Sequence, residues 1–275
     1  VDNNSTDNTM RVIDEYKNKY PDLIRVFCEK RKGAPCARNK GVAESKGEWI
    51  QFLDSDDEIL PQKLKHQMDL VATSRYDVIV SNSYIYRYSN DQRLSKTVRT
   101  SDENVWKGLL ISKLGITSAN LWRKEAVQLV SGWDENKNSS QEYDLLFRML
   151  QNNISIGFCH EILTIVHINP NSISNSRNDN RIVEILQNSI NLRLSVKKYL
   201  QSKNKLTKEL NQAADMHIYN SLIAYSSMIT IFFKKGIIPD YVRKTLRENS
   251  LSLPPSFLIK LFIKRTFTRI KGLFG

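Results

Sequence analysis

Cysteine is scarce in this sequence: Cys28, Cys36 and Cys159 are the only ones among 275 residues. Their odd number excludes a framework of paired disulfides, and their spacing does not match a cysteine-based metal site. We therefore expect a reducing, cytoplasmic compartment and a fold that depends on its hydrophobic core. The rest of the composition, 40% hydrophobic and 25% charged residues, is ordinary for a globular protein.

Acidic residues are scarce in the last part of the chain. From residue 197 onward there are 15 Lys and Arg against four Asp and Glu, which accounts for +11 of the formal net charge of +12. Such an excess suits an anionic membrane surface, nucleic acid or a solvated helical face, and the last is the commonest case. Because the basic residues interleave with apolar ones and the preceding part is nearly neutral, we expect no nucleic-acid partner.

The sequence has few long runs without charge. Residues 216–233 carry no Lys, Arg, Asp or Glu, but His217 and Asn220 within them favour a buried bundle helix over a membrane span. Residues 254–267 mix aromatic, aliphatic and basic side chains, as an interfacial anchor does, although on a helical wheel the faces are not cleanly separated. We expect residues 178–275 to be helical and to contact an anionic membrane peripherally.

A pair of carboxylates follows a short apolar run at residues 49–53, which reads as a buried strand. Asp54 and Asp56 are then expected at the carboxyl end of this strand, where open α/β sheets bind their ligands. Carboxylate oxygens suit hard cations such as Mg²⁺ or Mn²⁺. The alternative is that these residues only cap the helix that begins near Leu60, and the motif alone does not decide between the two.

The elements around this strand alternate in type. Apolar patterns predict strands at residues 23–27 and 77–80, and helices at 34–44 and from Leu60 to Val71. This order indicates an α/β fold with a mostly parallel sheet flanked by helices. Alternating tyrosines between residues 84 and 88 predict an edge hairpin.

Three motifs in this order resemble the nucleotide-binding half of a family 2 glycosyltransferase: residues 1–7, 33–41 and 49–57. The resemblance implies a GT-A type, Rossmann-like domain over residues 1–177, followed by the basic helical region 178–275. It also implies a nucleotide-sugar donor, with UDP expected as the nucleotide. Family members carry another strand and helix before the first motif, so we expect this chain to be N-terminally truncated.

The resemblance assigns roles to residues of the donor side. Asp56, with Asp54, is expected to bind a divalent cation, Mn²⁺ or Mg²⁺. Asp2, Asn3, Arg38 and Asp54 are expected to bind the donor, Asp2 through the base or ribose and Arg38 through base or phosphate.

A possible further metal ligand is His167, because many members have a histidine immediately before a proline where this chain has Asn169. The two residues share one face of a strand, but a lone histidine near a sheet is more often structural.

The catalytic base is expected near residue 142. An amphipathic helix begins there with acidic residues in its first turn, a position that the helix dipole favours in any case. Family members place their catalytic acid at such a helix start, which makes Glu142 the expected general base. One base without a protein nucleophile implies transfer with inversion, to a glycan or lipid-linked acceptor in bacterial surface polysaccharide synthesis at the inner face of the cell membrane.

Two other readings stay open. A nucleotidyltransferase also pairs acidic residues with a divalent cation, although it would normally carry a glycine-rich phosphate loop that this sequence does not show. A non-catalytic, membrane-associated fragment is the reading from a different class.

Overall fold

The computed structural model describes residues 1–89, 92–168 and 179–226. Unit 1 comprises Val1–Glu103 and Leu114–Ile168, and unit 2 comprises Asn104–Lys113 and the chain from Asn169 onward. Residues 254–267, expected to contact a membrane, lie outside the described residues, and so does Asn169. The two units are described separately.

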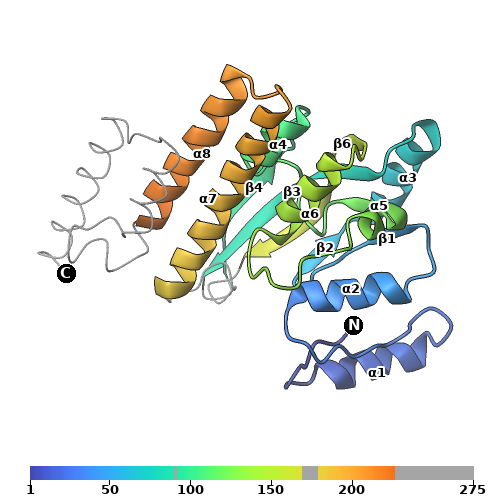
Figure 1. Cartoon of the computed structure of the whole chain (residues 1–275). Coiled ribbons are helices and arrows are strands. Elements are labelled where there is room, and N and C mark those ends of the chain that lie inside the picture. Colours follow the sequence, from blue (N-terminus) through green and yellow to red (C-terminus); the bar gives the residue numbers. More distant parts are fainter. Residues whose placement is uncertain (90–91, 169–178, 227–275) are drawn as a thin grey trace, which may run out of the picture. The chain divides into compact units, whose positions relative to one another are not determined.

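Unit 1 consists of a sheet with helices (Figure 1). Its helices are α1 (Thr9–Lys19), α2 (Ala34–Glu44), α3 (Lys63–Thr73), α5 (Lys124–Leu129) and α6 (Gln141–Gln151). Its strands are β1 (Trp49–Gln51), β2 (Asp57–Ile59), β3 (Val78–Ser89), β4 (Gln92–Arg99), β5 (Leu121–Arg123) and β6 (Ile156–Ile168).

The sheet is mixed, so the prediction of a mostly parallel sheet is wrong. The strand order is β1-β5-β3-β6-β2, with β4 pairing β3. Among the described strands only β3 and β6 pair in parallel, and the other pairs are antiparallel. β2 follows β1 through a short turn with no helix between them, whereas a parallel connection needs a dozen or more residues, and the three-residue strand β5 pairs antiparallel with both β1 and β3.

The predicted hairpin is present, but it is not only an edge. β3 pairs β4 from Ser83 to Ser89, and its opposite side pairs β6 along most of its length. The sheet core lies under the first half of β3, where Val78, Ile79 and Val80 are fully buried. β5 and β6 pair with this buried strand, and they pair in turn with β1 and β2.

Helix α3 forms close to its predicted position, but the adjacent face, which carries Lys63 and Gln67, is buried more fully than the expected apolar face. Leu64 and Met68 are 46% and 39% exposed, whereas Lys63 and Gln67 are fully buried. A charged residue is rarely buried without a partner. The buried face of α3 therefore includes a lysine and a glutamine that need polar partners inside the protein.

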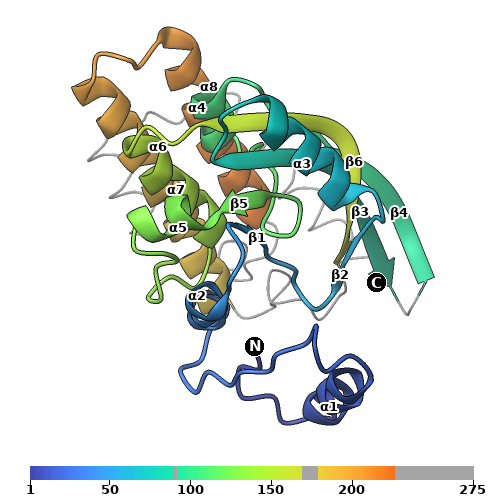
Figure 2. The ribbon, with the colours of Figure 1, turned by 90° about the vertical axis from the view of Figure 1, so that its right-hand side faces the viewer.

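The first 30 residues form little regular sheet. Asp2 and Cys28 make one isolated parallel bridge, and the expected strand at 23–27 is otherwise absent from the described residues; Leu23 is 82% exposed. Helix α1 has no buried residue and lies apart from the sheet in both ribbon views (Figures 1 and 2).

Unit 2 is helical in its described part, with α4 (Val105–Leu110), α7 (Asp179–Ser202) and α8 (Lys208–Ser226). Its core includes Leu110, Leu186 and Leu200, all fully buried. The buried Arg193 of α7 donates hydrogen bonds to the Leu110 carbonyl oxygen at 3.1 Å and to Ser112 Oγ, which ties α4 to α7. Among the described residues no helix is both long enough and apolar enough to cross a bilayer.

Candidate active site

The two acidic residues of the predicted cation site lie in a tight turn between β1 and β2. The Asp57 N–H donates to the Asp54 carbonyl oxygen at 3.0 Å, which closes the turn. The Asp54 N–H donates to Ser118 Oγ at 3.1 Å, and the same hydroxyl hydrogen bonds to the Asp57 carboxylate. Ser118 therefore holds both ends of the Asp54–Asp57 turn.

Negative charge is concentrated in this turn. Burial raises the pKa of Asp57 to about 6, and the negative charges of Asp54 and Asp56 act in the same direction, against the hydrogen bond from Ser118. Asp56 is exposed and Asp54 is 41% exposed, so their oxygens are accessible to a ligand. A cation at this turn would relieve the repulsion between the carboxylates.

Arg38 connects the turn to helix α6. Its Nη2 atom lies 2.7 Å from Asp54 Oδ1, and its Nη1 atom donates to Gln141 Oε1 at 2.9 Å. The guanidinium stacks over the Trp133 ring, with its carbon 4.6 Å from the ring centroid. A planar guanidinium suits this combination of stacking and two-directional hydrogen bonding. The Arg38 side chain thus contacts both the Asp54 carboxylate and Gln141, the first residue of α6.

Glu142 follows Gln141 in the first turn of α6 and is half-buried. Its carboxylate has no hydrogen-bond or ion-pair partner among the described residues. The helix start is fixed instead by Tyr143, whose hydroxyl donates to the Gly115 carbonyl oxygen at 2.9 Å and accepts from Arg99 at 2.9 Å. This carboxylate interacts electrostatically with the nearby Arg99. A carboxylate held on a fixed turn without a hydrogen bond of its own suits proton transfer.

Trp133, under Arg38, is positioned by Asn39 on α2. The Asn39 side chain donates to the Trp133 carbonyl oxygen at 2.9 Å and accepts from the Trp133 N–H at 2.8 Å. The preceding Gly132 has φ +71°, and a Cβ built there would lie 2.5 Å from Asn39 Oδ1. Both the positive φ and this close approach favour glycine at this position.

Asp2 and Asn3 lie in the loop region that joins the chain start to Gly33. The Asp2 side chain is buried and accepts from the Ser5 N–H at 3.2 Å, and hydrogen bonding to Ser5 lowers its pKa. Asn3 donates to the carbonyl oxygens of Glu29 and Arg31 and accepts from Gly33 N–H at 2.8 Å. Its amide therefore holds the loop together, and a direct contact with a donor stays a prediction.

The backbone N–H of His167 hydrogen bonds to the Asp57 carboxylate, but its side chain has other partners than the acidic turn. Its Nε2 lies 2.8 Å from Glu58 Oε1, and its Nδ1 lies 2.8 Å from the Tyr88 hydroxyl. In the β2–β6 register Asp57 faces Val166, so His167 points to the opposite side of the sheet from Asp57. A role of His167 as a cation ligand stays a prediction and would require one of these two hydrogen bonds to break.

The residues of the turn fit a cation that is shared with a ligand. No group of three or more His, Cys, Asp or Glu side chains that could hold a metal ion occurs in the part of the chain that the structure describes. A small hard cation next to phosphates needs only one or two protein carboxylates, because phosphate oxygens and water complete its coordination. Asp56 and Asp54 meet this smaller requirement.

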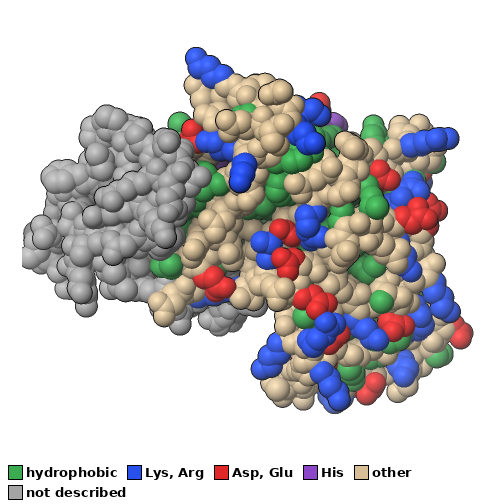
Figure 3. Space-filling model, viewed as in Figure 1, with side chains coloured by type: hydrophobic (Ala, Val, Ile, Leu, Met, Phe, Trp, Pro, Cys, Tyr) green, Lys and Arg blue, Asp and Glu red, His purple; other side chains and the backbone are tan. Residues whose placement is uncertain are grey.

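Charged side chains elsewhere on unit 1 largely pair with each other. Figure 3 shows Lys and Arg side chains lying among Asp and Glu side chains over α1 and α2. Lys40 and Glu44 of α2, for instance, lie 2.8 Å apart. This agrees with the near-neutral charge of the chain before its basic end.

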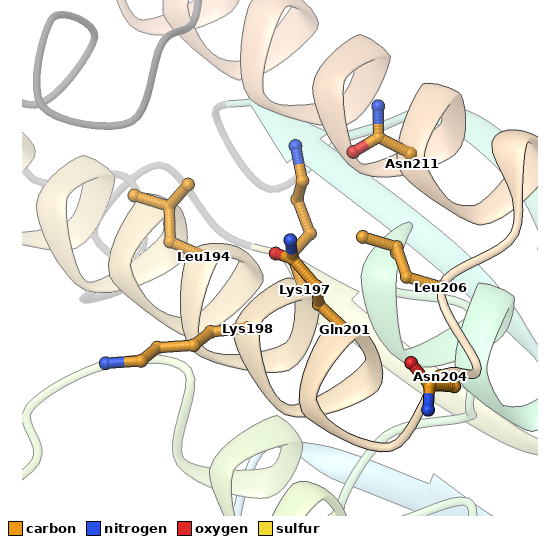
Figure 4. A pocket seen from close by; sticks show the side chains of 7 residues that line it. All are labelled: Leu194, Lys197, Lys198, Gln201, Asn204, Leu206 and Asn211. Carbon is orange, nitrogen blue, oxygen red and sulfur yellow. The ribbon is translucent and has the colours of Figure 1, made fainter.

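Unit 2 contains a separate cavity of about 650 Å³ (Figure 4). It is lined by Leu194, Lys197, Lys198, Gln201, Asn204, Leu206 and Asn211. Lys197 is paired with Asp215 at 2.5 Å, and the picture shows Lys198 pointing away from Asn204 and Asn211. The cavity contains none of the residues predicted to carry chemistry.

Sequence reasoning missed three contributors to the site: Ser118, Trp133 and Gln141. Each acts through a contact between segments far apart in the chain, and Arg38 and Gln141 are 103 residues apart. The polar segment that contains Ser118 and the aromatic residue after Gly132 can both be seen in the sequence. No local pattern, however, reveals that Ser118 contacts Asp54 or that Trp133 lies under Arg38.

Comparison with known proteins gives matches to glycosyltransferases. The sequence model of "Glycosyl transferase family 2" matches residues 1–131, which include α2, the Asp54–Asp57 turn and β3. Residues 1–131 of the chain belong to glycosyltransferase family 2. The chain is 26% identical to an uncharacterized glycosyltransferase of Rickettsia typhi over 81% of its own length and 67% of that protein. It is 30% identical to the cholesterol galactosyltransferase of Borreliella burgdorferi over 86 residues, 31% of this chain and 24% of that one.

Solved structures share the fold of the chain. Residues 1–349 of TarS from S. aureus, in complex with UDP-GlcNAc, align with a TM-score of 0.51 and 15% identity, covering 90% of this chain and 78% of that one. The mannosyltransferase PcManGT from Pyrobaculum calidifontis, in complex with GDP-Man and Mn²⁺, aligns with a TM-score of 0.52 and 12% identity over 97% and 76%. These likenesses establish the α/β, GT-A type fold. The chain spans from about a quarter to two thirds of the length of the two curated relatives.

Proposed function

We propose that this chain transfers a sugar, with inversion, from a nucleotide-sugar donor to a glycan or lipid-linked acceptor. The observation that carries the proposal is the Arg38 side chain, which joins Asp54 to the start of α6. The strand-end carboxylates and Glu142 therefore belong to one site. A donor bound at the turn would present its sugar near a carboxylate that has no hydrogen-bond or ion-pair partner among the described residues.

In this proposal the chain's residues divide the work between donor and acceptor. Asp2 accepts hydrogen bonds from the nucleoside, and the Asp54–Asp57 turn faces the diphosphate. Arg38 keeps Asp54 and α6 at a fixed separation. Glu142 takes the proton of the acceptor hydroxyl as that oxygen attacks the anomeric carbon, and the nucleoside diphosphate leaves from the opposite face.

A divalent cation is part of the proposal. Asp56 and Asp54 would hold Mn²⁺ or Mg²⁺, whose chemistry is to neutralise the charge that develops on the departing diphosphate. The crowding of carboxylates in the turn supports this, and so does the Mn²⁺ named for the PcManGT structure. UDP is the expected nucleotide, and the UDP-GlcNAc bound to TarS supports this expectation. Because PcManGT binds GDP-Man, the donor screen described below includes GDP-sugars as well.

The acceptor and the location are the least direct part of the proposal. The cholesterol galactosyltransferase among the relatives acts, by its name, on a lipid, which supports a lipid or lipid-linked acceptor. Together with the basic C-terminal region, it supports a site at the inner face of the cell membrane, in surface polysaccharide synthesis.

The test is a screen of nucleotide-sugars with the full chain and Mn²⁺, read by mass spectrometry. Release of nucleoside diphosphate supports sugar transfer, whereas pyrophosphate would support a nucleotidyltransferase. Absence of any donor binding by calorimetry would contradict both and leave the non-catalytic reading.

The role of Glu142 is tested by Glu142→Gln. We expect kcat to fall at least about a hundredfold, the usual contribution of a general base, while donor affinity changes less than about threefold. Glu125→Gln is the matched control, because Glu125 is an exposed acid in the first turn of α5. A loss of donor binding in Glu142→Gln would place Glu142 in the donor site instead.

A further inference from the structure

The buried face of α3 contains a lysine that the proposed reaction does not use. Lys63 is fully buried, and its Nζ atom lies 2.6 Å from Gln51 Oε1 on β1 and 2.6 Å from Gln67 Oε1 one helical turn further along α3. Among the described residues no carboxylate pairs with it. Its ammonium group is therefore held by two neutral amides.

These two contacts fix the orientation of both amides. An amide that accepts through its oxygen directs its NH₂ group the other way. Gln51 Nε2 accordingly donates to the Ser118 carbonyl oxygen at 2.9 Å, and to that of Phe52. Gln67 Nε2 donates to the Ala119 carbonyl oxygen at 3.0 Å. Lys63 thus orients two glutamine amides that donate hydrogen bonds to the consecutive carbonyl groups of Ser118 and Ala119.

The clamped segment is the one that holds the acidic turn. Ser118 and Ala119 are fully buried, and the Ser118 hydroxyl binds both the Asp54 N–H and the Asp57 carboxylate. A continuous series of hydrogen bonds therefore runs from Lys63 through Gln51 and Ser118 to the turn. A buried polar network of this kind is rigid when all its members are satisfied.

We propose that Lys63 is a positioning residue: it orients Gln51 and Gln67 so that they clamp the Ser118–Ala119 backbone, which in turn fixes the Asp54–Asp57 turn. Lys63 does not touch the donor. Its effect on the turn follows from the contacts alone, whereas its effect on donor binding rests on the proposed function.

Hydrogen exchange measured by mass spectrometry tests the effect on the turn. Lys63→Met keeps most of the length of the unbranched side chain and removes its donors. We expect about tenfold or greater acceleration of exchange in peptides covering residues 52–58 and 117–120, with the β3–β4 hairpin unchanged. Lys65→Met is the matched control on the same helix, because Lys65 is exposed and pairs only with Asp69.

Three results would decide the matter. Unchanged exchange at the turn, or acceleration spread evenly over unit 1, would overturn the proposal, since the latter describes a purely structural residue. If Lys63→Met does not fold, Gln51→Met breaks the same series at its next link, and we expect it to give the same local acceleration. If exchange at the turn in Gln51→Met were as slow as in the unaltered chain, the proposal would also be overturned.

Kinetics separate this inference from the proposed function. We expect Lys63→Met to raise the KM for the donor and the Mn²⁺ requirement about tenfold, with kcat changed less than about threefold. Lys63 and Ser118 act in one series. The double variant Lys63→Met/Ser118→Ala should therefore have a donor KM no more than about twofold above that of Ser118→Ala alone. If the unaltered chain neither binds nor uses a donor, the proposed function fails, and hydrogen exchange still decides the role of Lys63.

Discussion

Burial of Lys63 makes the stability of the chain depend on pH in a way that can be worked out. Burial lowers the pKa of Lys63 from 10.5 to about 7. Between these values the unfolded chain binds a proton that the folded chain does not, so this group makes stability rise with pH. The sign is the reverse of that for a lysine in a salt bridge: the unfavourable contribution is complete below pH 7 and is relieved as pH rises toward 10.5.

The magnitude follows from the same two values. At about 1.4 kcal/mol for each pH unit, their difference corresponds to about 5 kcal/mol over the full range. Between pH 6 and pH 9, where most proteins can be measured, about 3 kcal/mol of this should be visible. Replacing Lys63 by methionine removes the titrating group, so the free energy of unfolding of the two proteins should diverge by this amount as pH changes.

The assay is urea unfolding at pH 6, 7, 8 and 9, followed by the fluorescence of the buried Trp122 and Trp133 of unit 1. Subtracting the Lys63→Met curve from that of the unaltered chain cancels the titration of other groups. Lys65→Met, with an exposed side chain, should run parallel to the unaltered chain. Parallel curves for Lys63→Met as well would refute the reasoning, because they would show that Lys63 keeps an ordinary pKa in the folded state.

Three further predictions concern other features. Arg38→Met should lower kcat/KM about ten- to hundredfold in steady-state kinetics, because it removes hydrogen bonds of a charged group to Asp54 and Gln141; unchanged kinetics would contradict the linking role. Gly132→Ala should lower the free energy of unfolding by about 1–3 kcal/mol, because its φ is +71° and its Cβ would meet Asn39; an unchanged denaturation midpoint would contradict this. The full chain should sediment with phosphatidylglycerol vesicles and not with phosphatidylcholine vesicles, and sedimentation with neither would exclude peripheral attachment.

The sequence predicted those elements whose side-chain pattern is local. The helix that carries Glu142 has a clear apolar periodicity and formed as expected, and the helix at residues 34–44 formed as expected without one. β2 and β5 have only three residues each, too few for any pattern, and they make the sheet mixed. The burial of Lys63 could not be predicted either, because a lysine on an amphipathic helix normally faces water.

The same distinction applies to the candidate site. Asp54 and Arg38 could be singled out because each stands in a motif, and the structure brings them within 2.7 Å of each other. Ser118 has no motif of its own; Gln51 of β1 hydrogen bonds to its carbonyl oxygen, and Gln67 of α3 hydrogen bonds to that of the next residue, Ala119. His167 had the right residue type, yet the strand register turns it to the other side of the sheet from Asp57.

The double attachment of Arg38 has a mechanical consequence. Asp54 cannot rotate toward an incoming ligand without giving up its bond to a guanidinium that also holds the first residue of α6. A change at Asp54 therefore reaches, through Arg38, Gln141, which directly precedes Glu142. A ligand that drew Asp54 away from Arg38 would therefore also free the guanidinium to shift against Gln141, the residue next to Glu142.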